Sequence, residues 1–285
     1  MLLVTKMLLM GLEIFPLSLV VLSLLTFITT YIIAVSQKHV TPYLPYISDT
    51  GSKSPESCIF GQLLNISTML GFLGQACDTS APSSAVLKKF KLSFATMYVR
   101  YKLVASMVNI DSTRLHLLNK ISLGFGIIAA FGMSVVGNFQ ESNVLIVHLI
   151  GALMVFGVGA LYAILQSIIS YKMYPEYNGL SICRIRAAIS CFSSICFITT
   201  FAAAAAAGKN YKNDPLHWQP EMKGFAAHIV STASEWLLAI SFLSFFMTYI
   251  KDFRKVEIDI AGRVSVSHLD DCTSDYLNER SPLLR

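Results

Sequence analysis

The chain has 285 residues, of which 54% are apolar and only 14% charged, with a mean hydropathy of +0.59 and a net charge of +5. Ordinary soluble domains carry about 25% charged residues, so this composition excludes a soluble enzyme, a disordered regulator and a nucleic-acid-binding domain. About half of the chain, 144 residues, lies in six windows that together hold one charged residue, Glu235. Each window is long enough for a helix to cross a bilayer.

These windows predict an all-α, polytopic membrane protein built as a bundle of six transmembrane helices. The first window is too long for a removable signal peptide and ends without a small-residue cleavage site, so we interpret it as a retained span. Residues 1–257 would form one membrane domain, followed by a flexible tail at 258–285. The predicted spans are about 14–35, 58–77, 121–137, 144–170, 187–207 and 225–250.

The distribution of Lys and Arg predicts the orientation of this bundle. Six spans put both termini on one side of the membrane. If that side is the cytosol, 17 Lys and Arg residues lie in cytosolic segments and five in lumenal ones. Positive residues are retained on the cytosolic side, so we expect both termini there and the loops 38–56 and 209–223 in the lumen. The positive net charge would then face anionic membrane lipid, and no nucleic acid is expected as a partner.

The first lumenal loop contains two prolines, Pro42 and Pro45, with Tyr46 and the turn sequence Asp49-Thr50-Gly51. This triplet also occurs in aspartic proteases, but their chemistry needs two such loops sharing a proton, and the chain has only one. The loop is either a recognition surface or a rigid cap over the helix ends. We favour the cap, because loops that fix helix ends are common.

Glu235 is the one charge inside the predicted spans, and a carboxylate in hydrocarbon should face the interior of the bundle. His228, Ser231 and Glu235 share one face of the last span, because they are three and four residues apart. His148 opens the fourth span on the same side of the membrane. These residues form either a proton-responsive cluster or, as we favour, an interhelical hydrogen-bond network.

Catalysis is not expected from this sequence. A metal-dependent intramembrane hydrolase would need ligands at a recognisable spacing, such as two histidines four residues apart, and the sequence has no such pair. We therefore predict no catalytic residue, metal or cofactor. The sequon Asn65-Ile66-Ser67 lies in the middle of a predicted span, where it is out of reach of glycosylation.

The tail ends in a pattern typical of membrane-protein sorting. Glu279 stands four residues before Leu283 and Leu284, which matches the acidic dileucine signal. In such signals an adaptor protein takes the paired leucines in apolar pockets while a basic residue meets the acidic one. We therefore expect clathrin-adaptor-type proteins as partners of the tail, in addition to the membrane lipids that surround the spans.

Several motifs together resemble the damage-regulated autophagy modulators, and the tail most resembles the second paralogue of that family. The likeness runs from residue 11 to 285. It implies a lysosomal, multi-pass membrane protein that promotes autophagy and is linked to cell death, with residence in the plasma membrane or other endomembranes as a further possibility. The motifs are Pro45-Tyr46-Ile47-Ser48-Asp49-Thr50-Gly51, Met97-Tyr98-Val99-Arg100-Tyr101-Lys102, Asn138-Phe139-Gln140, Gln166-Ser167-Ile168-Ile169-Ser170-Tyr171, Glu235-Trp236 and Thr248-Tyr249-Ile250-Lys251-Asp252-Phe253.

The sequence departs from the family pattern in one place. About twenty residues, 74–93, separate the second span from the motif at 97–102, and we interpret them as an alternatively spliced or mispredicted segment. Two other functions stay open beside autophagy modulation. One is the handling of lipids or small solutes, which would need a cavity lined by Gln166, Glu235 and the histidines. The other is a scaffold that recruits autophagy or lipid-kinase components from the cytosol.

Overall fold

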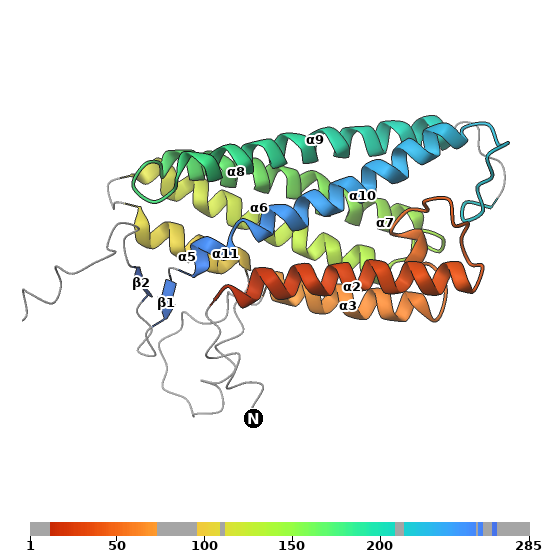
Figure 1. Ribbon diagram of the computed structural model, residues 1–285, viewed down its shortest axis with the longest axis horizontal. Helices are drawn as coiled ribbons and strands as arrows, with labels where there is room; N and C mark the ends of the chain where they lie inside the picture. The colour runs from red at the N-terminus through yellow and green to blue at the C-terminus, as the bar shows by residue number, and fades with distance from the viewer. Residues whose placement is uncertain are drawn as a thin grey trace, which may run out of the picture.

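The structure of the chain, a computed structural model, describes residues 12–72, 96–108, 112–208, 214–254, 256–258 and 264–266. Long helices lie side by side along one axis and form an elongated bundle (Figure 1). The elements in chain order are α2 (Ile14–Ser36), the 3-10 turn η1 (Asp49–Gly51), α3 (Glu56–Phe72), α5 (Thr96–Met107), α6 (Thr113–Asn138), α7 (Leu145–Ala152), the π-helical turn η2 (Leu153–Val158), α8 (Gly159–Lys172), α9 (Leu180–Gly208), α10 (Phe225–Met247), α11 (Ile250–Phe253), and the strands β1 (Val256–Ile258) and β2 (Val264–Val266).

Among the described residues, five helical segments are long and apolar enough to cross a membrane, which makes the chain an all-α, multi-pass membrane protein. They are α2, α6, the continuous segment Leu145–Lys172, α9, and Phe225–Phe253. The remaining long helix, α3, has 17 residues within the described part of the chain. It packs against α2 and α6 inside the bundle. At a rise of 1.5 Å per residue, α3 is about 26 Å long, just below the thickness of a typical hydrocarbon core.

Regular structure also occurs where the sequence analysis expects loop or tail. Helix α5 lies in a stretch that we counted as loop, and α6 begins at Thr113, eight residues before the predicted span. The Asn119 side chain donates a hydrogen bond of 2.9 Å to the carbonyl of Tyr101, which ties the start of α6 to α5. The strands β1 and β2 pair antiparallel, and β2 lies inside the segment predicted as a flexible tail.

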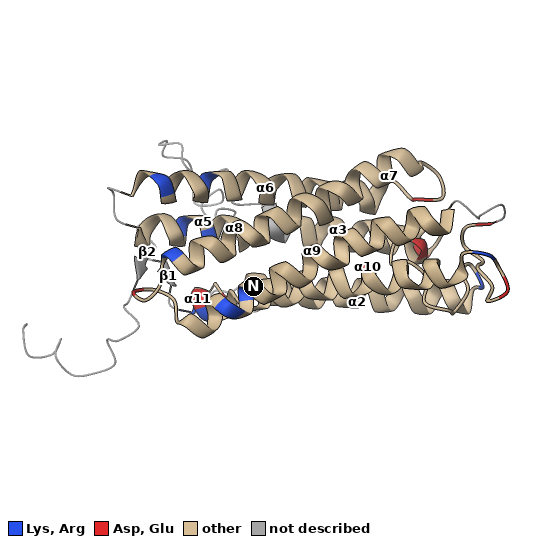
Figure 2. Ribbon diagram, turned by 90° about the horizontal axis from the view of Figure 1, so that it is seen from above, with Lys and Arg blue, Asp and Glu red and all other residues tan. Residues whose placement is uncertain are grey.

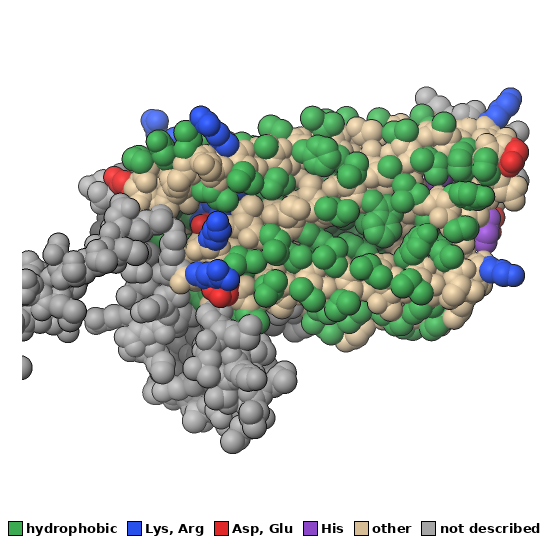
Figure 3. All heavy atoms as spheres, in the orientation of Figure 1, with side chains coloured by type: hydrophobic (Ala, Val, Ile, Leu, Met, Phe, Trp, Pro, Cys, Tyr) green, Lys and Arg blue, Asp and Glu red, His purple; other side chains and the backbone are tan. Residues whose placement is uncertain are grey.

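The surface of the bundle is apolar around its middle (Figure 3). Large side chains such as Ile32 on α2 and Ile198 on α9 are 59% and 65% exposed, which suits a lipid environment and would be unfavourable in water. The interior holds a second apolar layer, in which Leu243, Phe245 and Phe246 of α10 pack against α2, α5 and α8. Apolar side chains on both sides of each helix are typical of a bundle in a membrane.

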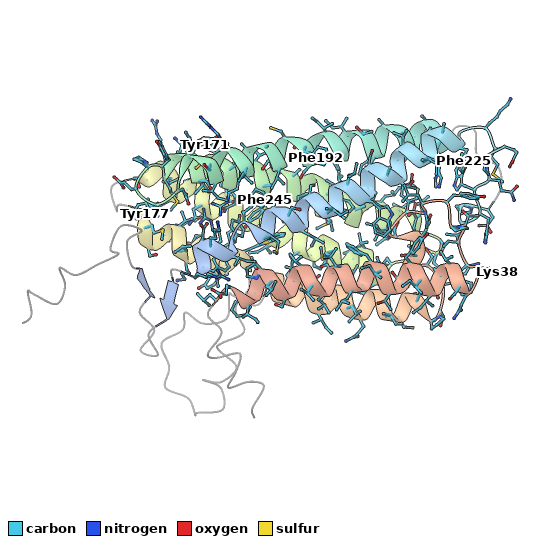
Figure 4. All side chains as sticks on the ribbon, viewed as in Figure 1. Lys38, Tyr171, Tyr177, Phe192, Phe225 and Phe245 are labelled. Atoms are coloured by element: carbon cyan, nitrogen blue, oxygen red, sulfur yellow. The ribbon has the colours of Figure 1, made fainter. Side chains whose placement is uncertain are left out.

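The two ends of the bundle differ in charge (Figure 2). The "loop end" is where α2 ends and α10 begins, and Lys38 and Phe225 mark it in Figure 4; Tyr171 and Tyr177 mark the opposite "basic end". Among the described residues, the loop end carries Lys38, Lys53 and Lys223. The basic end carries Arg100, Lys102, Arg114, Lys120, Lys172, Arg184, Arg186, Lys251 and Arg254.

Candidate functional site

The segment 45–51, which carries the longest family motif, folds back into the loop end of the bundle. Residues 47–51 are all buried, although they belong to a loop. Gly51 has no room for a side chain, because an added Cβ would lie 2.4 Å from Cγ of Phe60 on α3. The tip of the loop is therefore packed against the helices as closely as the helices are packed against one another, and we call residues 45–51 the "loop clasp".

Three successive residues of the loop clasp bind α10. The Pro45 carbonyl accepts a hydrogen bond of 2.9 Å from the indole N–H of Trp236. The Tyr46 hydroxyl donates to Ser231 at 2.7 Å, and the Ile47 backbone N–H donates to a carboxylate oxygen of Glu235 at 2.8 Å. These bonds satisfy polar groups that would otherwise be buried without partners. They also fix the loop against the last span.

Two more contacts join the loop clasp to other helices. The hydroxyls of Thr50 and Thr30 lie 3.0 Å apart, which links the loop to α2. Ser48 donates a hydrogen bond of 2.8 Å to Glu141, in the turn between α6 and α7. A separate pair lies nearby, where His39 contacts the fully buried Glu56 of α3 at 2.5 Å. The loop thus joins several helices at one point, as a rigid cap would.

Three of the four residues singled out by the sequence, His228, Ser231 and Glu235, contact the loop clasp. Ser231 and Glu235 both bind it, and the ring of His228 packs edge-on to Tyr46 and stacks on Trp218 with centroids 4.4 Å apart. His148 stands apart, with Nδ1 2.8 Å from the Phe139 carbonyl and Nε2 3.8 Å from Glu141. The backbone of the loop, rather than a histidine, is therefore the hydrogen-bond partner of Glu235.

The loop end concentrates carboxyl groups in a buried setting. Burial, together with the carboxylates of Glu141 and Glu235, raises the pKa of Asp49 well above its usual range. Burial also raises the pKa of the Tyr46 hydroxyl. In contrast, the backbone N–H of Leu216 lowers the pKa of the exposed Asp214. Protonation of Asp49 therefore favours the folded state.

A second polar cluster lies buried at the basic end. Arg100 of α5 and Arg186 of α9 are 1% and 0% exposed, and both bind one carboxylate oxygen of Asp252, at 2.9 and 2.5 Å. Both guanidinium groups lie over the ring of Tyr249, about 5 Å from its centroid. Ser170 of α8 accepts a hydrogen bond from each arginine. We call these five residues the "arginine cluster".

The arginine cluster joins three of the family motifs. Arg100 comes from 97–102, Ser170 from 166–171, and Tyr249 with Asp252 from 248–253. Gln166 adds a further link, because it accepts a bond of 3.2 Å from Arg100 and donates one of 2.9 Å to Ser122 on α6. In the sequence, both arginines fall in segments that we expected to be cytosolic loops, and the cluster was not predicted. The available signal was that each arginine belongs to an apolar, helix-forming stretch.

One cavity of about 110 Å³ lies inside the bundle in the described part of the chain. Glu235 and His148 line it, but Gln166 and His228 do not, so it contains half of the residues that the lipid-handling hypothesis requires. Its remaining wall is mostly apolar and comes from α2, α3, α5, α6, α7, α8, α10 and the π-helical turn. The bundle therefore has an internal space that reaches the loop clasp at Ile47 and Ser48.

Comparison with known proteins decides the family. A family model, the Frag1/DRAM/Sfk1/Cwh43P N-terminal domain, matches residues 11–75 and 85–256. The chain belongs to this family. The DNA damage-regulated autophagy modulator protein 2 of Rattus norvegicus is 36% identical over 282 residues, which cover 96% of both chains. Protein 1 of Homo sapiens is 38% identical over 90% of this chain and 96% of its own.

A third relative matches a shorter part of the chain, and the family model leaves a gap inside the segment 74–93. The Modulator of macroautophagy TMEM150B-A of Xenopus laevis is 30% identical over 73% of this chain and 71% of its own. The family model skips residues 76–84, which lie within the segment 74–93 that departs from the family pattern. No solved structure matches the chain. Segment 74–93 and the tail residues Glu279, Leu283 and Leu284 lie outside the described residues.

Proposed function

We propose that this chain promotes autophagy from the lysosomal membrane, without catalysis and with a link to apoptosis. The observation that carries the proposal is its identity of 36–38% with autophagy modulators over at least 90% of its length. The names of these relatives describe modulators and not enzymes. The two polar clusters among the described residues, at the loop clasp and at the arginine cluster, connect helices to one another.

The proposal includes six spans with both termini in the cytosol. Helix α3 would be the second span, since its 17 residues reach the lower limit of observed transmembrane helices. The basic end would face the cytosol, because it carries nine of the described Lys and Arg residues while the loop end carries three. In this orientation the loop clasp lies on the lumenal side, where a lysosome is acidic.

The tail would bring the protein to the lysosome. Glu279, Leu283 and Leu284 would bind a clathrin-adaptor-type protein, and the double change Leu283→Ala and Leu284→Ala should move the protein to the cell surface. The matched control is Leu277→Ala, which changes a leucine of the same tail outside the signal. Lysosomal residence of the double variant would contradict the sorting role of these residues.

Autophagic flux tests the proposed function itself. Cells that lack the protein should degrade autophagosome contents more slowly, and re-expression of the full chain should restore the rate. The sorting variant should restore it less, since it would be absent from lysosomes. A flux that is unchanged by loss and by re-expression would contradict the proposal.

A second candidate function is the handling of a lipid, and the observation that favours it is the internal cavity beside Glu235. A scaffold for cytosolic lipid-kinase components is the remaining alternative. Deletion of the tail separates the two, because lipid handling would persist in vesicles reconstituted with the truncated protein while recruitment through the tail would fail.

A further inference from the structure

The internal cavity is long for its volume. Along α10 its wall runs from Glu235 to Phe246, eleven positions further on, which corresponds to about 16 Å at 1.5 Å per residue. Its volume is only about 110 Å³, close to that of cavities that hold a single benzene molecule. This space follows the helix axes, so its shape suits one flexible chain better than a rigid ring system.

The π-helical turn forms part of this wall. Val155 and Phe156 of the turn, and Gly159 directly after it, line the cavity. None of the six residues of the turn is buried, although α7 and α8 on either side of it contain several buried residues. Single π-helical turns inside α-helices occur often at functional sites. The fourth span therefore changes its winding where it borders the cavity.

Two hydroxyl groups in the wall have no hydrogen-bond partner among the described residues. Ser23 of α2 and Ser67 of α3 are 1% and 0% exposed, and both line the cavity. A hydroxyl in a transmembrane helix commonly bonds the carbonyl four residues before it, as Thr26 and Thr68 do here at 2.8 Å. Ser23 and Ser67 forgo that bond, which points to a polar atom inside the cavity as their partner.

The Ser23 hydroxyl lies deeper in the bundle than the carboxyl group of Glu235. The ring of Phe27 contacts Trp236, the neighbour of Glu235, with centroids 6.2 Å apart. Ser23 precedes Phe27 by four residues, which places it about 6 Å further along α2. The cavity thus offers hydrogen-bonding groups at two depths, with Glu235 and His148 toward the loop end and Ser23 about one helical turn further in, and Ser67 adds another hydroxyl to the wall.

Two features restrict the charge and size of a ligand's head group: the charge of the cavity wall, and the loop clasp that covers one end of the cavity. Among the described residues no Lys or Arg lines the cavity, so a phosphate would have no cation beside it. The loop clasp covers the polar end, where Ile47 and Ser48 form part of the wall. A ligand must therefore have a small, uncharged head with oxygen atoms spread over about one helical turn.

We propose that the cavity binds a neutral single-chain lipid of the monoacylglycerol class, taken from the surrounding bilayer. Its glycerol hydroxyls would bond to Glu235 and His148 and its ester oxygens to Ser23 and Ser67, so that the head group fills the cavity, while its acyl chain would leave the cavity past Leu243 and Phe246 into the bilayer. The inference rests on lipid handling, the second candidate function, and is independent of the role in autophagy.

Photolabelling of the purified full-length protein tests this proposal. The probe is a monoacylglycerol that carries a diazirine in its acyl chain. Labelling should be saturable, map to peptides of α2 and α10 that line the cavity, and be displaced by unlabelled monooleoylglycerol. Oleic acid should compete at least fivefold more weakly, because it lacks the second group of oxygens, and lysophosphatidylcholine should not compete.

Variants separate specific binding from labelling of the membrane-facing surface. Ser23→Leu and Ser67→Leu fill the cavity and should lower saturable labelling at least tenfold, while the smaller changes Ser23→Ala and Ser67→Ala should lower it about fivefold. The matched control is Ser244→Leu, at an exposed site on α10 outside the cavity, which should label like the original protein. Each variant is first shown to be monodisperse.

Three results would overturn the proposal. These are labelling that does not saturate, labelling that is equal in the Ser23→Leu variant and in the Ser244→Leu control, and equal competition by lysophosphatidylcholine. Because binding is measured on purified protein, such a failure would leave the autophagic-flux result unaffected. Conversely, an unchanged flux would leave the binding result unaffected.

Discussion

Replacement of Asp252 by Asn should destabilise the protein more than any surface substitution of a charge. The change keeps the shape and a hydrogen-bond acceptor but removes the one carboxylate that Arg100 and Arg186 share. Because both arginines are at most 1% exposed, their charges would stay buried without a counter-ion. Breaking a buried pair in this way typically costs about 3–5 kcal/mol.

The remaining contacts of the arginines reduce this cost only partly. Arg186 keeps its bonds to Ser170 and to Thr248, and both guanidinium groups keep their position over Tyr249. Cation–π contacts contribute about 0.5–2 kcal/mol each. We therefore expect Asp252→Asn to lower the free energy of unfolding by about 3 kcal/mol, toward the lower end of the range for buried pairs.

Equilibrium unfolding of the detergent-solubilised protein measures this effect. The control is Glu13→Gln, which breaks the pair between Glu13 and Arg254 at 3.2 Å, with side chains 28% and 63% exposed. That pair should be worth less than about 1 kcal/mol. The double variant Arg100→Gln, Asp252→Asn should recover part of the loss, because it removes one of the unpaired charges. If Asp252→Asn and Glu13→Gln lower the free energy of unfolding equally, Asp252 is not the shared counter-ion of two buried arginines.

The loop end yields four further predictions. Asp49 has a raised pKa, so the unfolding temperature should rise as the pH falls through that raised value and level off below about 3.9, the value in the unfolded chain; Asp49→Asn should abolish this rise, and an unchanged pH profile would contradict it. Asp214→Asn, with a lowered pKa, should instead remove a contribution that is present above about pH 3.9 and lost below it. Gly51→Ala should cost about 1–3 kcal/mol through its clash with Phe60, whereas Gly124→Ala, where a Cβ meets nothing within 4 Å, should not destabilise; equal thermal shifts would refute the close packing of the loop clasp. Tyr46→Phe should cost about 1 kcal/mol by removing the bond to Ser231, and no change in unfolding free energy would show that this bond is not formed.

Local composition was enough to place the long helices along the chain. The predicted span 187–207 lies within α9, and the predicted span 144–170 differs from the segment Leu145–Lys172 by one residue at its start and two at its end, because a charge-free run of this length has few alternatives to a membrane helix. The π-helical turn inside that segment carries no comparable signal. It depends on how the fourth span packs against its neighbours, and the sequence Leu153–Val158 is ordinary for a membrane helix.

The polar contacts were harder to predict because their partners are distant in the sequence. Burial of Glu235 followed from its position in an apolar span, and it is 7% exposed. Its partner is the backbone N–H of Ile47, 188 residues away, which no side-chain pattern can reveal. We counted Arg100 and Arg186 among the cytosolic positive charges. That count gave no indication that both are buried against Asp252. The motifs showed which segments mattered but not that they meet.

With six spans, both termini would lie in the cytosol and the loop clasp in the lumen. Epitopes at the two termini, detected in cells whose plasma membrane alone is permeabilised, test this arrangement directly. A glycosylation sequon introduced near Lys53, in the loop between α2 and α3, reports the other side of the membrane. We expect both termini to be accessible and the new sequon to be glycosylated. Termini on opposite sides, as the five helices of unambiguous length alone would give, would contradict this arrangement.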